Sequence, residues 1–223
     1  MTIEKISSVT EVLFYVNEEQ KHRTTIFFDI DDTLIRSKGN FPCPNINFRR
    51  HFSLALKEQR WRTYKGKFMS HYNSDYIDLV RDYNDTVLDR KWELTEPEHL
   101  PSMFKAINME SYHYYFLTAR GVELHYTTKA WLKRLRLYPK PGNRMYRKDC
   151  YDIPNITDRS GVRGNIIYAG GYDKCQLLVD ASFQAFPNVV MVDDSLSNLE
   201  SFDRYFSNNE LVKFVGLHYE NNV

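Results

Sequence analysis

The chain has 223 residues, of which 42% are hydrophobic and 15% aromatic, a composition that predicts a folded protein and excludes a disordered one. Its 30 basic and 29 acidic residues nearly balance, so no overall charge points to nucleic acid as a partner. Three widely spaced cysteines, Cys43, Cys150 and Cys175, match neither a disulfide framework nor a zinc site, which favours a reducing compartment.

The first twenty residues lack a basic segment followed by a long apolar run, so no secretory signal is expected. No apolar run approaches the length of about 18 residues that a membrane helix needs. We therefore expect a cytoplasmic protein without a membrane span, with signal-independent export to a host cell as an alternative. The oligomeric state does not follow from the sequence.

The predicted elements alternate between strands and helices. Apolar residues at helical spacing predict a leading helix over residues 8–20, with Ser8 as its N-cap. Continuous apolar runs of the kind found in buried parallel strands then predict strands in 24–28, 112–120, 164–171, 188–195 and 211–219. Amphipathic patterns predict helices over 127–137 and 173–186. This alternation predicts an α/β fold with a Rossmann-like, doubly wound parallel sheet.

Two stretches interrupt the alternation. Residues 36–96 are rich in Arg, Lys and Tyr and mostly helical in pattern, which predicts a small helical insertion. Residues 138–163 are rich in proline and glycine and show little periodicity, so they predict an extended loop or hairpin. We therefore expect one core, made of residues 1–35 and 97–223, with residues 36–96 inserted into it.

Polar residues gather at the ends of the predicted strands. In parallel sheets the carboxyl ends of the strands share one edge, where ligands bind. The residues that should meet there combine carboxylates, a hydroxyl and an ammonium group: Asp29, Asp31, Thr118, Lys174, Asp193 and Asp194.

A divalent cation and a phosphate would explain this cluster. Asp29 and Asp193 offer the hard oxygen ligands that Mg²⁺ prefers, and a cation would relieve the repulsion among the carboxylates. Thr118 and the backbone N–H groups after it are suited to phosphate oxygens, and Lys174 adds a positive charge. A carboxylate can attack phosphorus to give an aspartyl-phosphate, while a second carboxyl two residues on handles the proton.

The order of these motifs resembles the haloacid dehalogenase (HAD) superfamily of phosphohydrolases. The segment "DIDDT" (29–33) matches the first motif of that superfamily, and "FLTAR" (116–120) matches the second. Lys174 in "GGYDK" resembles the third motif, and "VVMVDDSLSN" (189–198) the fourth. The resemblance covers essentially the whole chain outside residues 36–96, and the first and fourth motifs are its most specific part.

The resemblance implies the catalytic and metal-binding roles. Asp29 would be the nucleophile and a ligand of Mg²⁺. Asp31 would be the general acid/base, and its backbone carbonyl would reach the metal. Asp193 would bind Mg²⁺ directly, whereas Asp194 would act through water or by fixing Lys174.

The same resemblance implies the phosphate-binding residues. Thr118 and Lys174 would hold the phosphoryl group together with Ala119, although Lys129 or Lys148 are alternatives to Lys174. Arg120 has two alternatives of equal weight, a phosphate contact and a structural ion pair. Asn198 is likewise divided between support of the acidic pair and a surface position.

One departure from the superfamily pattern, one residue choice and one further similarity refine this interpretation. Many relatives carry Gly where this chain has Asp32, and we expect Asp32 to point away from the site. A carboxyl at position 31 favours a phosphatase over ATPase pumps, which carry Thr there, and over dehalogenases, which lack the Asp. The leading helix, "FDIDDTL", "LTAR" and the terminal "VGLHY" also resemble a HAD subgroup of unknown function that is frequent in bacteria living inside host cells.

An insertion after the first motif is where this superfamily carries a cap that selects the substrate. Residues 36–96 occupy that position, and their basic side chains would face either solvent or an anionic substrate: Arg49, Arg50, Arg60, Arg62, Lys65 and Lys67.

The function expected from the sequence is a Mg²⁺-dependent phosphatase that hydrolyses phosphomonoesters through an aspartyl-phosphate. Its expected substrate is a small phosphorylated molecule, with a phosphoprotein as an alternative. Two other functions stay open: a phosphotransferase or mutase of the same fold, and a protein-binding effector module with weak or vestigial catalysis.

Overall fold

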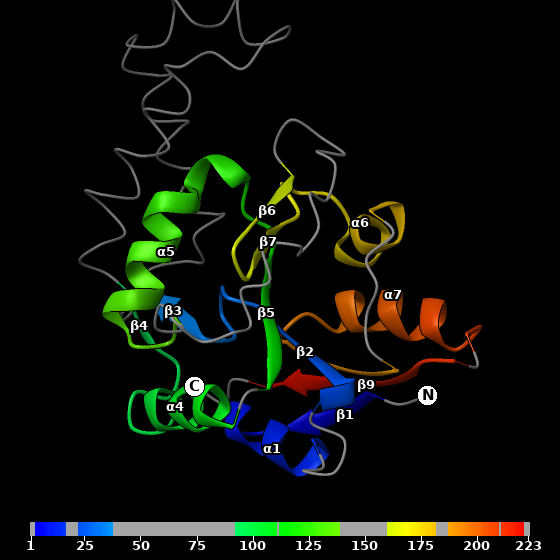
Figure 1. Cartoon of the computed structure of the whole chain (residues 1–223), viewed down its shortest axis with the longest axis horizontal. Coiled ribbons are helices and arrows are strands. Elements are labelled where there is room, and N and C mark those ends of the chain that lie inside the picture. The colour runs from blue at the N-terminus through cyan, green and yellow to red at the C-terminus, as the bar shows by residue number, and fades with distance from the viewer. Residues whose placement is uncertain are drawn as a thin grey trace, which may run out of the picture. The chain divides into compact units, whose positions relative to one another are not determined.

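The structure is a computed structural model that describes residues 3–16, 22–37, 92–110, 112–138, 160–181, 187–209 and 211–220. Within these residues the central sheet has seven strands in the order β1-β9-β8-β2-β5-β7-β6 (Figure 1). Neighbouring strands pair in parallel, except that β6 runs antiparallel to β7. The strands are β1 (Ile3–Ile6), β2 (Thr24–Phe28), β5 (His113–Thr118), β6 (Gly161–Arg163), β7 (Ile166–Tyr168), β8 (Asn188–Asp193) and β9 (Lys213–Tyr219).

Helices cover both faces of this sheet. Figure 1 shows α6 and α7 on one side of it and α1 and α4 on the other. The described helices are η1 (Val9–Glu11), α1 (Val12–Tyr15), α4 (Leu100–Met109), η4 (Val122–Leu124), α5 (His125–Arg134), α6 (Lys174–Asp180) and α7 (Leu196–Phe206). The architecture is therefore α/β with a mostly parallel sheet, consistent with the predicted Rossmann-like fold. None of the described helices is long and apolar enough to span a bilayer.

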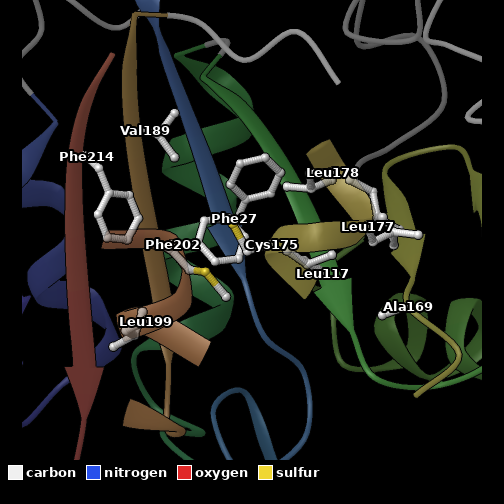
Figure 2. Packing of buried hydrophobic residues seen from close by; sticks show 12 residues of the cluster. Phe27, Leu117, Ala169, Cys175, Leu177, Leu178, Val189, Leu199, Phe202 and Phe214 are labelled. Atoms are coloured by element: carbon white, nitrogen blue, oxygen red, sulfur yellow. The ribbon is translucent and has the colours of Figure 1, made fainter. Parts of the chain in front are cut away.

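The central strand β2 joins two hydrophobic layers. All five of its residues are buried, which explains why "TTIFF" shows no polar alternation. Phe27 belongs to a cluster that includes Leu177 of α6 and Phe202 of α7 (Figure 2). The next residue, Phe28, points to the opposite face, where its ring lies 5.0 Å from that of Phe104 in α4. Burying side chains of this size contributes roughly 2 kcal/mol each.

The five strands predicted from apolar runs are confirmed as β2, β5, β7, β8 and β9. The predicted helices correspond to α5 and α6, and the start of the leading helix to η1 and α1. Ser8 caps η1 as predicted, because it accepts from the Thr10 N–H while Glu11 bonds back to the Ser8 N–H.

Several elements are additional to those predicted. The short strand β1, whose sequence is "IEKI", pairs with β9 at the edge of the sheet. The helices α4 and α7, which were not predicted, each bury an apolar face. Strand β6 lies at the end of the predicted loop or hairpin, residues 138–163, and pairs with β7. The turn between the two strands contains Gly164, whose φ of 65° is a conformation that favours glycine.

The chain divides into two compact units, residues 1–35 with 94–223, and residues 36–93. Strands β3 (Ile35–Ser37) and β4 (Trp92–Leu94) form a separate two-stranded sheet. Within the second unit, Arg36 Nε bonds Glu93 Oε1 at 3.1 Å. The predicted helices of the insertion, its six basic residues, and most of residues 138–163 lie outside the described residues.

Candidate functional site

The candidate site lies where the sheet changes its winding direction. From β2 the chain proceeds to β5 and β7 on one side and then returns to β8 on the other. Phe28 at the end of β2 is paired with Phe116 of β5 and with Val192 of β8, and the Asp29 N–H donates to the Val192 carbonyl at 2.9 Å. Ligands of open α/β sheets bind at such a switch point.

Lys174 is the centre of the polar cluster at this edge. Its Nζ donates to Asp29 Oδ1 at 2.6 Å and to Asp193 Oδ2 at 2.7 Å. All three side chains are almost fully buried, with 4%, 8% and 0% of the Lys174, Asp29 and Asp193 side chains exposed. The predicted convergence of β2, β8 and the start of α6 is therefore confirmed, and Lys174 contacts Asp29. Of the two alternative lysines, Lys148 lies outside the described residues.

The acidic pair at the end of β8, Asp193 and Asp194, is held by several donors. Asp193 Oδ1 accepts from the Ser195 N–H at 2.8 Å, and Asn198 Nδ2 lies 3.0 Å from both Asp193 oxygens. Thr33 Oγ1 accepts from the Asp194 N–H at 3.0 Å and lies 3.2 Å from Asp194 Oδ1. These hydrogen bonds fix the orientation of both carboxylates.

Asp29, Asp193 and Asp194 fit a divalent cation. Each can offer one carboxylate oxygen, and these ligand atoms lie within 4.8 Å of one another. The donors are hard oxygens, which suit Mg²⁺ as well as Ca²⁺ or Mn²⁺. The predicted metal role of these three residues is compatible with the geometry, whereas their position does not select Mg²⁺ among such cations.

Burial and like charge perturb the titration of this cluster. Burial raises the pKa of Asp29 well above its usual value, and the charges of Asp193 and Asp31 add to this although Lys174 opposes it. Burial by itself would lower the pKa of Lys174, but Asp29 and Asp193 outweigh it and raise that pKa. Burial, with the charges of Asp193 and Asp32, raises the pKa of Asp194 to about 6.

The predicted phosphate-binding segment follows β5. Thr118 is fully buried, and its Oγ1 accepts from the Arg120 N–H at 3.2 Å. The carbonyls of Ala119 and Arg120 accept from the N–H groups of Gly171 and Gly170, both at 2.9 Å. These two hydrogen bonds join the segment 118–120 to the turn that leads into Lys174. Both glycines of this turn have positive φ, a conformation that glycine adopts without strain.

Asp31 is not joined to Lys174 but to Arg120. Arg120 Nη2 donates to Asp31 Oδ1 at 2.6 Å, and its Nε donates to Asp31 Oδ2 at 2.9 Å. Of the two alternatives for Arg120, the structure contains the ion pair. Asp31 is the more exposed partner, with 19% of its side chain accessible against 8% for Arg120.

Asp32 lies within electrostatic range of the acidic pair, because its charge contributes to the raised pKa of Asp194. That its carboxylate points away from the site stays a prediction. Its φ is 62°, in the left-handed region that glycine adopts freely and Asp or Asn tolerates better than other residues. This backbone requirement explains why Gly and Asp can both serve at this position.

The structure adds supporting residues that the sequence did not assign. Thr33 is part of the "DIDDT" motif, and this position was the available signal for its contact with Asp194. Asn198 is the support residue of Asp193, which decides between its two alternatives. His218 Nε2 lies 3.0 Å from the Asp194 carbonyl oxygen, and nothing in the sequence near His218 indicated this contact.

Comparison with known proteins gives a family but no activity. Residues 5–223 match a family described as "Protein of unknown function (DUF2608)". Neither the curated proteins nor the solved structures yield a significant match.

Proposed function

The chain belongs to the DUF2608 family, whose function is unknown, and we propose that it is a divalent-cation-dependent phosphatase of the HAD type. The observation that carries the proposal is the buried contact of Lys174 with Asp29 and Asp193, beside Asp194, at the switch point of the sheet. A structural ion pair needs one carboxylate for one lysine. Two carboxylates contact the Lys174 ammonium and a third lies beside them. When all three are ionised they carry a net negative charge that a cation would balance.

Asp29 is the proposed nucleophile. It directly follows the central strand β2, and the Asp29 N–H is tied to the neighbouring strand β8, so its carboxylate is held on a rigid element. Attack of an Asp29 oxygen on phosphorus forms the aspartyl-phosphate and breaks the bond from phosphorus to the leaving oxygen. The contact with Lys174 favours the ionised form of Asp29 that this attack requires, against the opposing effect of burial.

The remaining residues serve the phosphate and the proton. Lys174 and the Thr118 segment would attract phosphate oxygens. Asp31 donates a proton to the leaving oxygen, then accepts one from the water that hydrolyses the aspartyl-phosphate and restores Asp29. A cation held by Asp29, Asp193 and Asp194 would supply positive charge opposite the phosphate oxygens, and Mg²⁺ is the proposed ion.

Residues 36–93 are proposed as the cap. This unit is inserted directly after the first motif, and its basic residues include several suited to an anionic substrate. A small phosphorylated molecule is the proposed substrate class.

The test is hydrolysis of 4-nitrophenyl phosphate by the purified chain with Mg²⁺. We expect turnover that EDTA abolishes and that Asp29→Asn abolishes, because a neutral amide cannot be the nucleophile. Asp180→Asn is the matched control, since Asp180 is an exposed aspartate of α6 that bonds Tyr172 and Gln176, and it should keep full activity. Undiminished turnover by Asp29→Asn would contradict the mechanism.

A further inference from the structure

Arg120 has all three guanidinium nitrogens engaged inside the protein. Two of them, Nε and Nη2, grip the two oxygens of Asp31 at 2.9 and 2.6 Å. The third, Nη1, donates to Thr128 Oγ1 of α5 at 3.1 Å. The guanidinium carbon also lies 5.1 Å from the ring centroid of Trp131, a distance at which a cation is attracted to the ring face.

A second layer holds Thr128 in turn. The Thr128 side chain also interacts with the hydroxyl of Tyr168 in β7, and that hydroxyl lies 3.2 Å from His125 Nδ1. Thr128 and Tyr168 are fully buried, so their hydroxyls have fixed partners. The orientation of Arg120 is therefore determined by β5, α5 and β7 together.

We propose that Arg120 is the positioning residue of Asp31 and not a ligand of the substrate phosphate. The inference rests on the proposed function, in which Asp31 carries the proton. A bidentate guanidinium fixes both the plane and the rotation of a carboxylate. It occupies two of the roughly four lone-pair positions of Asp31 and leaves the others for the proton.

The geometry argues against direct phosphate binding by Arg120. To reach a phosphate with its fork, the guanidinium would have to release Asp31, Thr128 or both. That would separate a pair of charges in a largely buried place, which costs more than it does at the surface. Lys174 lies beside Asp29 and needs no such exchange to meet the phosphate.

The two roles predict different kinetics. General acid catalysis matters for a poor leaving group and little for a good one, so loss of positioning should depend on the leaving group. Loss of a phosphate ligand should instead lower kcat/KM equally for all esters. Because kcat/KM reports the steps up to departure of the alcohol, it responds to the leaving group even if dephosphorylation limits kcat.

The experiment measures kcat/KM on phenyl phosphate and 4-nitrophenyl phosphate for Arg120→Met, Asp31→Asn and the double variant. Methionine keeps apolar volume against Trp131. We expect Arg120→Met to lose about 10- to 100-fold on phenyl phosphate and much less on 4-nitrophenyl phosphate. In the Asp31→Asn background the same change should cost no more than about twofold, because the residue it acts through is already disabled. Arg204→Met, an exposed arginine of α7, is the matched control and should leave both values unchanged.

Arg120→Lys separates the alternatives if Arg120→Met does not fold. A lysine can bind phosphate as a point charge but cannot grip a carboxylate with two parallel bonds. Positioning therefore predicts that Arg120→Lys loses the activity on phenyl phosphate selectively. Equal losses on the two esters, full retention of activity in Arg120→Lys, or additive losses with Asp31→Asn would each overturn the inference.

A double-mutant cycle of urea unfolding tests the same contact without any measurement of activity. It uses the wild type, Arg120→Met, Asp31→Asn and the double variant. If Arg120 grips Asp31, the losses of stability from Arg120→Met and Asp31→Asn should not add in the double variant. Wild-type protein that is inactive on both esters would contradict the proposed function alone. Additive losses of stability would overturn the positioning of Asp31 by Arg120 even in that case.

Discussion

At the scale of single residues, the site depends on charge balance in a buried place. Lys174 neutralises part of the charge of Asp29 and Asp193 through contacts of 2.6 and 2.7 Å. An ammonium group and a divalent cation would offset the same carboxylates, so the two should substitute for one another in stabilising the fold.

Lys174→Met tests this substitution. In EDTA we expect the free energy of unfolding to fall by about 3–5 kcal/mol, because two buried carboxylates lose their partner. Added Mg²⁺ should raise the unfolding midpoint more in this variant than in the wild type, as measured by urea denaturation. Lys105→Met, which replaces an exposed lysine of α4, is the control. A variant as stable as the wild type in EDTA would contradict the expectation.

Asp194 gives the site a pH dependence of known sign. Burial and the charges of Asp193 and Asp32 raise its pKa to about 6, above the value near 4 of an unfolded chain. The folded protein therefore binds the proton more tightly, and this contribution to stability is present below about pH 4 and lost as the pH rises through 6.

Asp194→Asn should remove that contribution. Without divalent cations, the wild type should lose thermal stability between pH 4 and 6 more steeply than the variant. With Mg²⁺ present the loss in the wild type should be smaller, because a cation favours the ionised carboxylate. Melting temperatures measured across pH 4–8 check both statements. Parallel curves for the two proteins in EDTA would contradict the first, and an equal loss in the wild type with and without Mg²⁺ would contradict the second.

At the scale of elements, the first helix is fastened to a distant one by a single carboxylate. Glu96 accepts from the Val9 N–H at 2.6 Å and from Ser8 Oγ at 2.5 Å. Its own carbonyl accepts from the N–H groups of His99 and Leu100, where α4 begins. Glu96 therefore joins the start of η1 to the start of α4 on one face of the sheet.

Glu96→Ala should lower the free energy of unfolding by about 1–3 kcal/mol, because hydrogen bonds to a charged acceptor are lost and an N–H of the helix start is left without it. Glu98→Ala, two residues away and exposed, should change stability by less than about 0.5 kcal/mol. Chemical denaturation of both variants measures the difference. Equal effects at the two positions would show that Glu96 does not fasten the helices.

At the scale of the whole molecule, the described members of the main hydrophobic cluster all belong to one of the two units. The hydrophobic cluster around Phe27 draws its described members from β2, β5, β7, β8, β9, α6 and α7, all within residues 1–35 and 94–223. The candidate metal ligands Asp29, Asp193 and Asp194 belong to the same unit.

Replacing residues 38–91 by a short Gly/Ser linker should therefore leave a folded core. We expect cooperative unfolding and an Mg²⁺-dependent rise of the unfolding midpoint, both measurable by circular dichroism. If the inserted unit is the cap, the truncated chain should retain hydrolysis of 4-nitrophenyl phosphate and lose discrimination among larger phosphate esters. A chain without cooperative unfolding would contradict the independence of the core.

The strands were predictable to the extent that burial leaves a local signal. Continuous apolar runs indicated β2, β5, β7, β8 and β9 because a central parallel strand is covered on both faces. The edge strand β1 has only four residues and two of its side chains are exposed, so its pairing with β9 leaves no comparable pattern. The helices α4 and α7 were not predicted, although each has buried apolar residues at helical spacing.

The candidate site was predictable where its residues stand at strand ends. Asp29, Thr118 and Asp193 follow from strand positions and the order of motifs, and Lys174 from the start of a helix. Partners that come from other elements gave no such signal. Arg120 with Asp31, and His218 with the Asp194 carbonyl, are contacts between residues far apart in the chain.

The sequence by itself determined that the chain forms an α/β core with acidic residues at the ends of its strands, because apolar runs and strand-end carboxylates are local properties. Only the tertiary structure decided which charges meet. It placed Lys174 between Asp29 and Asp193 and turned Arg120 toward Asp31. The physical reason is that electrostatic energy depends on distance and burial, which the order of strands in the sheet sets and the spacing along the chain does not.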